Sequence, residues 1–117
     1  MNNKRLLAQS MARECLTTLR TSDENEWTLP RPLHLKHLLW MCEAINEHSN
    51  HWPIAKLHRW IGFVQAGLLA NRMLTLKQLK LMFDKSKAKY GIPDEDDDLI
   101  DHLDPTNAFE LDIGGQA

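Results

Sequence analysis

The chain has 117 residues, of which 43% are hydrophobic, and this is enough material for one hydrophobic core but not for two. It has only two cysteines, without CxxC spacing, and its first residues lack the apolar run of a signal peptide, which argues against a secreted domain built on disulfides. We therefore expect a single domain in a reducing compartment, the cytoplasm, with Cys15 and Cys42 as buried apolar side chains.

The formal net charge of −2 conceals a sharp division along the chain. Residues 1–93 hold all 14 Lys and Arg against seven acids, a net charge of +7, whereas residues 94–117 hold the other nine acids and no Lys or Arg. We divide the chain into a basic helical domain, residues 1–93, and an acidic C-terminal tail, residues 94–117, which we expect to be flexible when unbound. This asymmetry bears on partners and self-association rather than on the fold.

The N-terminal segment predicts an amphipathic helix from about Asn3 to Leu19. Its apolar residues form one stripe, which consists of Leu7, Met11, Cys15 and Leu19, with Leu16 beside it. The polar segment at 21–26 and the prolines at 30 and 32 then predict a loop of about a dozen residues. We expect Trp27 and Leu29 to hold this loop on the core, since a loop of this length is otherwise costly to order.

A second amphipathic helix is predicted from about Leu33 to Glu47. Its buried side consists of Leu35, Leu38, Leu39, Cys42 and Ile45. Trp40 falls at the boundary between the apolar and the polar face. The break at 48–51 is short, and a short link favours antiparallel packing of this helix against the next one.

The stretch from Pro53 to Asn71 predicts the central helix of the core. Its apolar side consists of Ile54, Leu57, Ile61, Val64 and Leu68, and no charge occurs over residues 60–70. Basic residues at 56, 58 and 59 interrupt the run too early for a membrane span, so we expect burial within protein. Trp60 is interpreted, with Ile61 and Val64, as part of the scaffold that positions the other helices.

Thr75 predicts the N-cap of a fourth helix, which runs to Tyr90 and ends at Gly91 as its C-cap. The buried side of this helix consists of Leu76, Leu79, Phe83 and Tyr90. No strand pattern of any length appears. The predicted fold is therefore all-α, a single compact bundle of about four helices followed by the acidic tail.

The spacing of histidines raises the possibility of a metal site, since His34 and His37 are three apart, as are His48 and His51. Structural zinc sites use four ligands with cysteine prominent, and neither cysteine joins these pairs in sequence. The HExxH motif and a glycine-rich phosphate loop are both absent from the sequence. We therefore expect ordinary histidines, no cofactor and no enzymatic activity.

Two charged segments are the candidate partner-binding regions. The basic candidates are Lys56, Arg59, Arg72, Lys77, Lys80 and Lys87, and the tail candidates are Asp96, Asp97, Asp98, Leu99 and Ile100. Lysines near a helix C-terminus also stabilise the helix, so the basic cluster has the alternative interpretation of a solvated face. The tail either solubilises the protein or docks, through its alternating acidic and apolar residues, on a basic surface of a partner or of this chain.

The run Lys56-Leu57-His58-Arg59-Trp60-Ile61-Gly62-Phe63-Val64-Gln65, preceded by Trp52-Pro53 and followed by a Thr75-initiated basic helix, resembles a family of small uncharacterised tailed-bacteriophage proteins. The resemblance covers about a third of the 117 residues. Family members usually have Gln-Gly where this chain has Gln65-Ala66-Gly67, and both chain ends fall outside the resemblance. It implies a phage or prophage origin, and small phage accessory proteins often bind host proteins or nucleic acid.

The function we expect is that of a non-enzymatic accessory protein in the cytoplasm of a bacterial host. It would bind and modulate a host macromolecule, a component of host defence or replication, through its basic helical face or its acidic tail. The alternative is a nucleic-acid-binding accessory or regulatory protein, which the basic residues near aromatic side chains favour.

Overall fold

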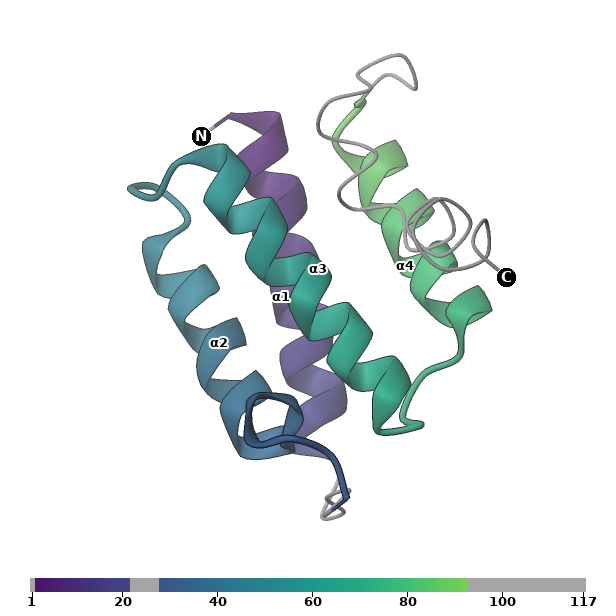
Figure 1. Ribbon diagram of the computed structural model, residues 1–117. Coiled ribbons are helices and arrows are strands. Elements are labelled where there is room, and N and C mark those ends of the chain that lie inside the picture. Colours follow the sequence, from purple (N-terminus) through teal and green to yellow (C-terminus); the bar gives the residue numbers. More distant parts are fainter. Residues whose placement is uncertain (1, 22–27, 93–117) are drawn as a thin grey trace, which may run out of the picture.

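The computed structural model describes residues 2–21 and 28–92 of the chain. These form α1 (Asn3–Arg20), a short 3₁₀ turn η1 (Arg31–Leu33), α2 (Leu35–His48), α3 (Ile54–Ala70) and α4 (Leu76–Lys89). Figure 1 shows that successive helices run in opposite directions, so α2 and α3 are antiparallel as predicted. The predicted all-α fold of four helices is confirmed for this part of the chain, whereas the acidic tail lies outside the described residues.

The second helix begins two residues later than predicted. Arg31, Pro32 and Leu33 form η1, in which the backbone N–H of Leu33 donates to the carbonyl of Pro30 at 2.9 Å. His34 is then extended, with ψ of 148°, so an α-helix can start only after it. Its imidazole Nε2 lies 2.7 Å from the carbonyl oxygen of Leu29, which fixes the end of the preceding loop.

Three helices, α1, α2 and α3, contact one another, and α4 packs against α1 on the side away from α2 (Figure 1). Their buried apolar side chains form one core, to which α4 contributes Met82 and Phe83. Ile61 and Val64 of α3 are fully buried, as their predicted scaffold role requires. Cys15 and Cys42 are also buried, with free thiols.

The helices α2 and α3 approach each other closely at Gly67. A β-carbon built at this glycine would lie 2.5 Å from Cδ1 of Leu38, which is itself fully buried. The absence of a side chain at Gly67 therefore brings Leu38 onto the backbone of α3, and residues on the outer edges of both helices come within reach of one another.

The ends of the last two helices follow specific capping patterns. The hydroxyl of Thr75 accepts from the N–H of Gln78 at 3.1 Å, and the Gln78 side chain accepts from the N–H of Thr75 at 2.8 Å, which confirms Thr75 as the N-cap of α4. Gly91, with φ of 62°, ends α4 as predicted. At the end of α3 the same left-handed position is occupied by Arg72, with φ of 61°.

None of the helices in the described ranges combines the length and apolar character that crossing a membrane requires.

Candidate binding surface between α2 and α3

A groove between the outer edges of α2 and α3 brings together three of the four tryptophans of the chain. We call it the tryptophan groove, and its lining consists of Trp40, Glu43, Ala44, Glu47, His48, Trp52 and Trp60. Its volume is about 360 Å³. Trp40 on its rim has 55% of its surface exposed, and Phe63, one turn after Trp60 on α3, has 38% exposed.

The rings of the groove form a continuous series across the two helices. His37 and Trp40 have centroids 5.5 Å apart, and Trp40 lies 5.7 Å from Trp60. Trp60 meets Trp52 edge to face at 4.7 Å, and Trp52 stacks on His48 at 4.9 Å with an interplanar angle of 14°. Such contacts hold each ring in one orientation, so the groove is preorganised.

Side chains of α1 fix the loop that carries Trp52. Arg5 Nη1 donates to the carbonyl oxygens of Ser49 and Trp52 at 2.9 and 2.6 Å. The amide of Gln9 donates to the Ser49 hydroxyl at 2.9 Å. Because Ser49 is the C-cap of α2, Arg5 also places a positive charge at the negative end of that helix.

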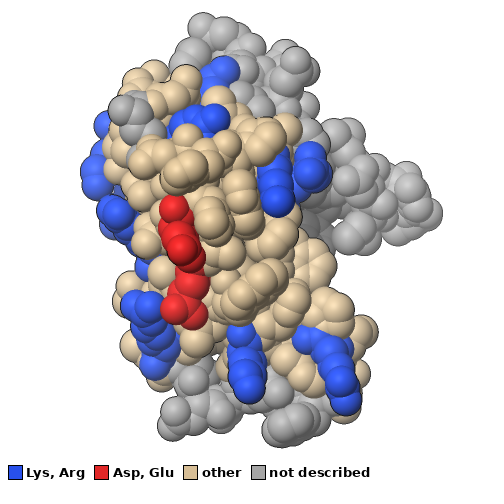
Figure 2. Space-filling model, turned by 90° about the vertical axis from the view of Figure 1, so that its left-hand side faces the viewer, with Lys and Arg blue, Asp and Glu red and all other residues tan. Residues whose placement is uncertain are grey.

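The groove has charges of both signs on its edges. Lys56 Nζ lies 3.8 Å from the ring centroid of Trp52 and 5.4 Å from that of Trp60, so one indole face already pairs with a cation. Glu43 and Glu47, both exposed, are the two acids of α2. Figure 2, which shows the side of the molecule where α2 lies, has its acidic side chains in one narrow stripe with Lys and Arg around it.

A second hollow adjoins the tryptophan groove on the other side of Trp40. We call it the basic hollow, and its lining consists of Arg31, Pro32, His34, Lys36, His37 and Trp40. Its volume is about 580 Å³. The indole of Trp40 therefore separates a neighbourhood rich in cations from one that contains two carboxylates.

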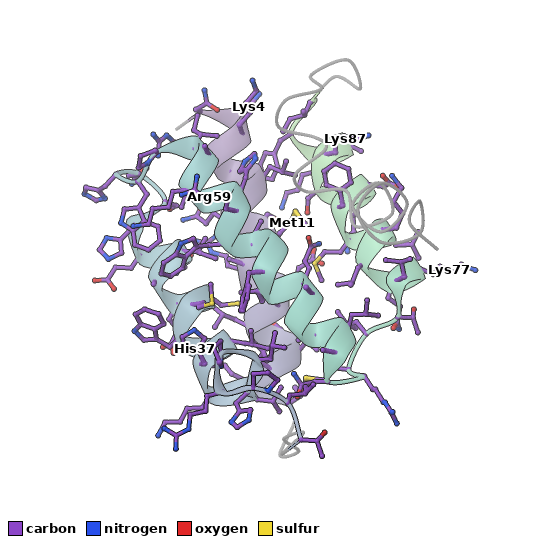
Figure 3. The ribbon with its side chains drawn as sticks, viewed as in Figure 1. Lys4, Met11, His37, Arg59, Lys77 and Lys87 are labelled. Atoms are coloured by element: carbon purple, nitrogen blue, oxygen red, sulfur yellow. The ribbon has the colours of Figure 1, made fainter. Side chains whose placement is uncertain are left out.

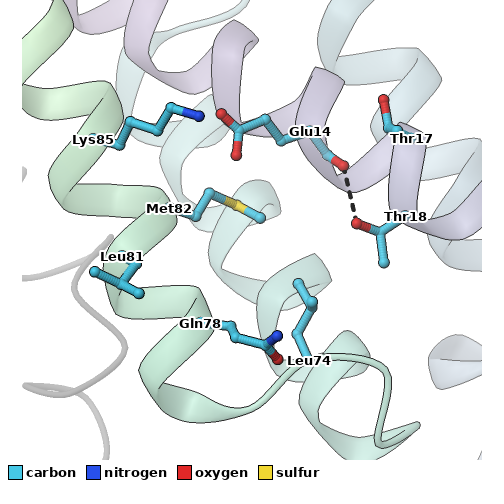
Figure 4. A pocket seen from close by; sticks show the side chains of 8 residues that line it. All are labelled: Glu14, Thr17, Thr18, Leu74, Gln78, Leu81, Met82 and Lys85. Carbon is cyan, nitrogen blue, oxygen red and sulfur yellow. Dashed lines mark hydrogen bonds between the residues drawn. The ribbon is translucent and has the colours of Figure 1, made fainter.

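A third hollow lies between α1 and α4 (Figure 4) and measures about 430 Å³. Leu81 in its lining has 58% of its surface exposed, whereas Met82, also in the lining, is buried. Figure 4 shows Lys85 from α4 and Glu14 from α1 pointing toward each other across it. Apart from Leu81, this hollow has no exposed large apolar side chain, and it contains no aromatic ring.

The structure does not gather the predicted basic residues into one patch. Figure 3 shows Arg59 on α3, Lys77 at the start of α4 and Lys87 near its end, on different parts of the surface. Lys80 pairs with Asp84 at 3.3 Å, and Lys87 Nζ lies 5.2 Å from the ring centroid of Phe83.

Two other predicted basic residues are placed differently. Lys56 joins the tryptophan groove, whereas Arg72 lies in the turn between α3 and α4. The tail candidates, residues 96–100, lie outside the described residues.

The described residues include all 14 Lys and Arg but only four acids, so their net charge is +10.

The three tryptophans of the groove were not among the predicted binding residues. Trp60 packs against the core, as the scaffold interpretation expects, but it is only half-buried and also lines the groove. The available signal was that three of the four tryptophans fall within 21 residues, at 40, 52 and 60.

The two cysteines have buried, free thiols. Cys15 Sγ is 3.9 Å from the sulfur of Met82. A hydrogen bond with Cys42 and burial raise the pKa of the Cys15 thiol well above its ordinary value. A thiol held protonated in this way is a poor nucleophile. Among the described residues, no group of three or more His, Cys, Asp or Glu side chains is arranged to hold a metal ion.

Comparisons of the chain with protein-family models, with curated proteins and with solved structures gave no match.

Proposed function

We propose that this chain is a non-enzymatic accessory protein that binds and modulates a host protein, and that the tryptophan groove is its docking surface. The observation that carries the proposal is the exposure of Trp40 beside the half-buried Trp52 and Trp60. A compact monomer rarely leaves such an aromatic cluster in contact with water without a binding role. Tryptophan is also the side chain that most often dominates the energy of protein–protein interfaces.

The preorganisation of the groove supports the same proposal. The indoles are held by ring contacts and by the hydrogen bonds from Arg5 to the loop before α3. A partner therefore does not need to immobilise these side chains, and less of the interaction energy is lost on ordering them.

The expected phage origin supports a host protein as the class of partner, since small phage accessory proteins often act on host macromolecules. In this proposal Lys56 borders the docking surface, Arg59 and Arg72 steer the encounter, and the basic residues of α4 form a separate charged surface. The acidic tail retains its proposed role as a second interaction segment.

Nucleic-acid binding is the second candidate function, and the basic hollow favours it. Arg31 and Lys36 could contact phosphates there while a base stacks on Trp40. On the other side of the same indole, however, Glu43 and Glu47 would repel the next phosphates of a strand. A protein surface can supply charges of both signs, so it complements the whole face better.

A capture experiment with matched variants tests the proposal. The tagged full chain, Trp40→Ala and Leu81→Ala are compared in lysate of the bacterial host treated with nuclease. Trp40 and Leu81 are about equally exposed, at 55% and 58%, so both variants remove an exposed apolar side chain without disturbing the core. We expect one host protein to be retained by the full chain and by Leu81→Ala and lost with Trp40→Ala. Equal retention of the host protein by the full chain and by Trp40→Ala would contradict the proposal.

A further inference from the structure

We propose that the tryptophan groove receives an arginine side chain of the partner protein, stacked on Trp40 and paired with Glu47 and Glu43. This inference rests on the proposed function, because it names the chemistry that the docking surface recognises. It assigns a specific ligand to the groove, the guanidinium group of a protein segment, and not merely an apolar partner surface.

The aromatic part of the groove is suited to a cation. The ammonium of Lys56 lies 3.8 Å from the centroid of Trp52, so the indoles of this cluster already pair with a positive charge within the chain. His48 stacks on Trp52, whereas Trp40 is in contact with the rings of Trp60 and His37 and still has 55% of its surface exposed. Trp40 therefore has indole surface available for an incoming planar group.

The carboxylates of the groove complete the recognition of a cation. Glu43 and Glu47 lie four residues apart on α2, so they project from the same side of the helix. Glu47 has no ion pair within the described residues, and Glu43 has only a contact of 3.9 Å with Arg20 in which both side chains are more than half exposed. Such an exposed pair contributes little and is readily exchanged.

Arginine fits this arrangement better than lysine. A guanidinium is planar, stacks on an indole face and donates two parallel hydrogen bonds to a carboxylate. Lysine offers a compact ammonium that cannot do both at once. The groove has a volume of about 360 Å³ and is open to solvent, which suits a side chain that enters from a partner surface.

The basic hollow gives the inference a direction. Arg31 and Lys36 before Trp40 on the chain repel a second cation, and Lys56 over the Trp52 ring does the same at that indole. The position left for the partner's arginine is therefore at Trp40 and the carboxylates of Glu43 and Glu47. Arg31 and Lys36 also disfavour a uniformly basic partner. They favour a partner segment in which the arginine is followed first by an apolar residue that contacts Trp40 and then by an acidic residue.

The test is a titration of the full chain with a heptapeptide whose two ends are chemically blocked. Its central arginine lies between two leucines, and a glutamate follows on the C-terminal side. The same peptide with citrulline in place of arginine is the neutral isostere, and one with lysine is the second comparison. Binding is followed through the indole N–H signals in two-dimensional NMR spectra, assigned with single Trp→Phe variants. The acidic tail can also attract a cationic peptide. Binding in the groove is therefore shown only by shifts of the indole signals of the groove tryptophans.

We expect the indole signals of Trp40 and Trp60 to shift with the arginine peptide, with an affinity about ten-fold higher than for citrulline. Trp40→Ala and the isosteric Glu47→Gln should each weaken binding by about five- to ten-fold. Glu14→Gln, which removes the same charge from the hollow between α1 and α4, should leave the affinity unchanged.

Equal binding of the citrulline peptide, or equal weakening by Glu47→Gln and Glu14→Gln, would overturn the inference. A response to an oligonucleotide but not to the arginine peptide, or dimerisation that Trp40→Ala abolishes, would overturn it by assigning the groove to another occupant. If the arginine peptide fails while host-protein capture still depends on Trp40, the proposed function stands and only the ligand class is wrong.

Discussion

Arg5 and Trp52 are joined by a hydrogen bond of 2.6 Å, from Nη1 of the guanidinium to the backbone carbonyl oxygen. The same nitrogen donates to Ser49 at 2.9 Å. One side chain near the start of α1 therefore holds both the end of α2 and the approach to α3. The position of the Trp52 ring, and with it the inner wall of the tryptophan groove, depends on a contact made by residues 47 positions apart.

Arg5→Ala should lower the free energy of unfolding by about 2 kcal/mol, because two part-buried carbonyls lose a charged donor. The free energy of unfolding of Arg5→Lys should lie between that of the unaltered protein and that of Arg5→Ala, since an ammonium restores the charge but cannot reproduce the guanidinium geometry. Urea denaturation measures the stability, and near-UV circular dichroism reports the tryptophan environment. A substitution that left both unchanged would show that the loop is held by other contacts.

Gly67→Ala should destabilise the protein although alanine favours helix. The added methyl would lie 2.5 Å from Leu38 Cδ1, and the resulting overpacking costs about 1–3 kcal/mol, against a gain of about 1 kcal/mol in helix propensity. In a Leu38→Ala background the clash is absent, so Gly67→Ala should there be neutral or stabilising. Additive effects in this double-mutant cycle would contradict the close approach of the two helices.

The helices could be predicted from the sequence because their signals are local. The apolar stripe of α1, the N-cap at Thr75 and the C-cap at Gly91 each depend on residues within one or two turns, and the structure confirms them. The sequence does not predict the 3₁₀ turn at 31–33, because the effect of this turn on the start of α2 depends on the extended conformation of His34.

The tryptophan groove could not be predicted in the same way. Trp40 lies at the edge of the apolar stripe of α2, and such a residue is either covered by another helix or left exposed, depending on how the neighbouring helix approaches. That approach is set by Gly67 and Leu38, which are 29 positions apart in the sequence. Exposed and covered tryptophans produce the same periodicity, so only the packed structure separates them.

Arg72→Gly should stabilise the protein by about 1 kcal/mol. Arg72 has φ of 61° at the end of α3, where its N–H donates to Leu69 and that of Met73 to Leu68, both at 3.0 Å. Glycine adopts this conformation without strain, whereas the β-branched variant Arg72→Val should destabilise. Thermal unfolding of the three proteins measures the order. If the glycine variant were the least stable, the arginine side chain would have a structural role that outweighs backbone strain.

The Cys15 thiol predicts a loss of stability in alkaline solution. Its hydrogen bond with Cys42 and its burial raise its pKa in the folded protein well above the ordinary value of 9.0. Below that value both states hold the proton and the full stability is present. As the pH rises further, only the unfolded state loses the proton, so the free energy of unfolding falls by up to about 1.4 kcal/mol per pH unit.

Urea denaturation from about pH 8 to about pH 10.5 measures this slope. Cys15→Ala should flatten it, whatever its effect on absolute stability. Leu16→Ala is the matched control, because it removes a buried side chain from the same helix without removing an ionisable group. An unchanged slope in Cys15→Ala would assign the alkaline loss to other groups.

The docking role of the tryptophan groove is tested most directly by a photo-crosslinking tryptophan analogue, which keeps the indole ring, placed at position 40 and, in a second protein, at position 81. Both positions are exposed to a similar degree, 55% and 58%, but they lie on α2 and α4. In host cells, position 40 should form a covalent adduct with one host protein, and position 81 should form little or none. Equal adducts from both positions, or adducts from position 40 to nucleic acid alone, would contradict the proposed function.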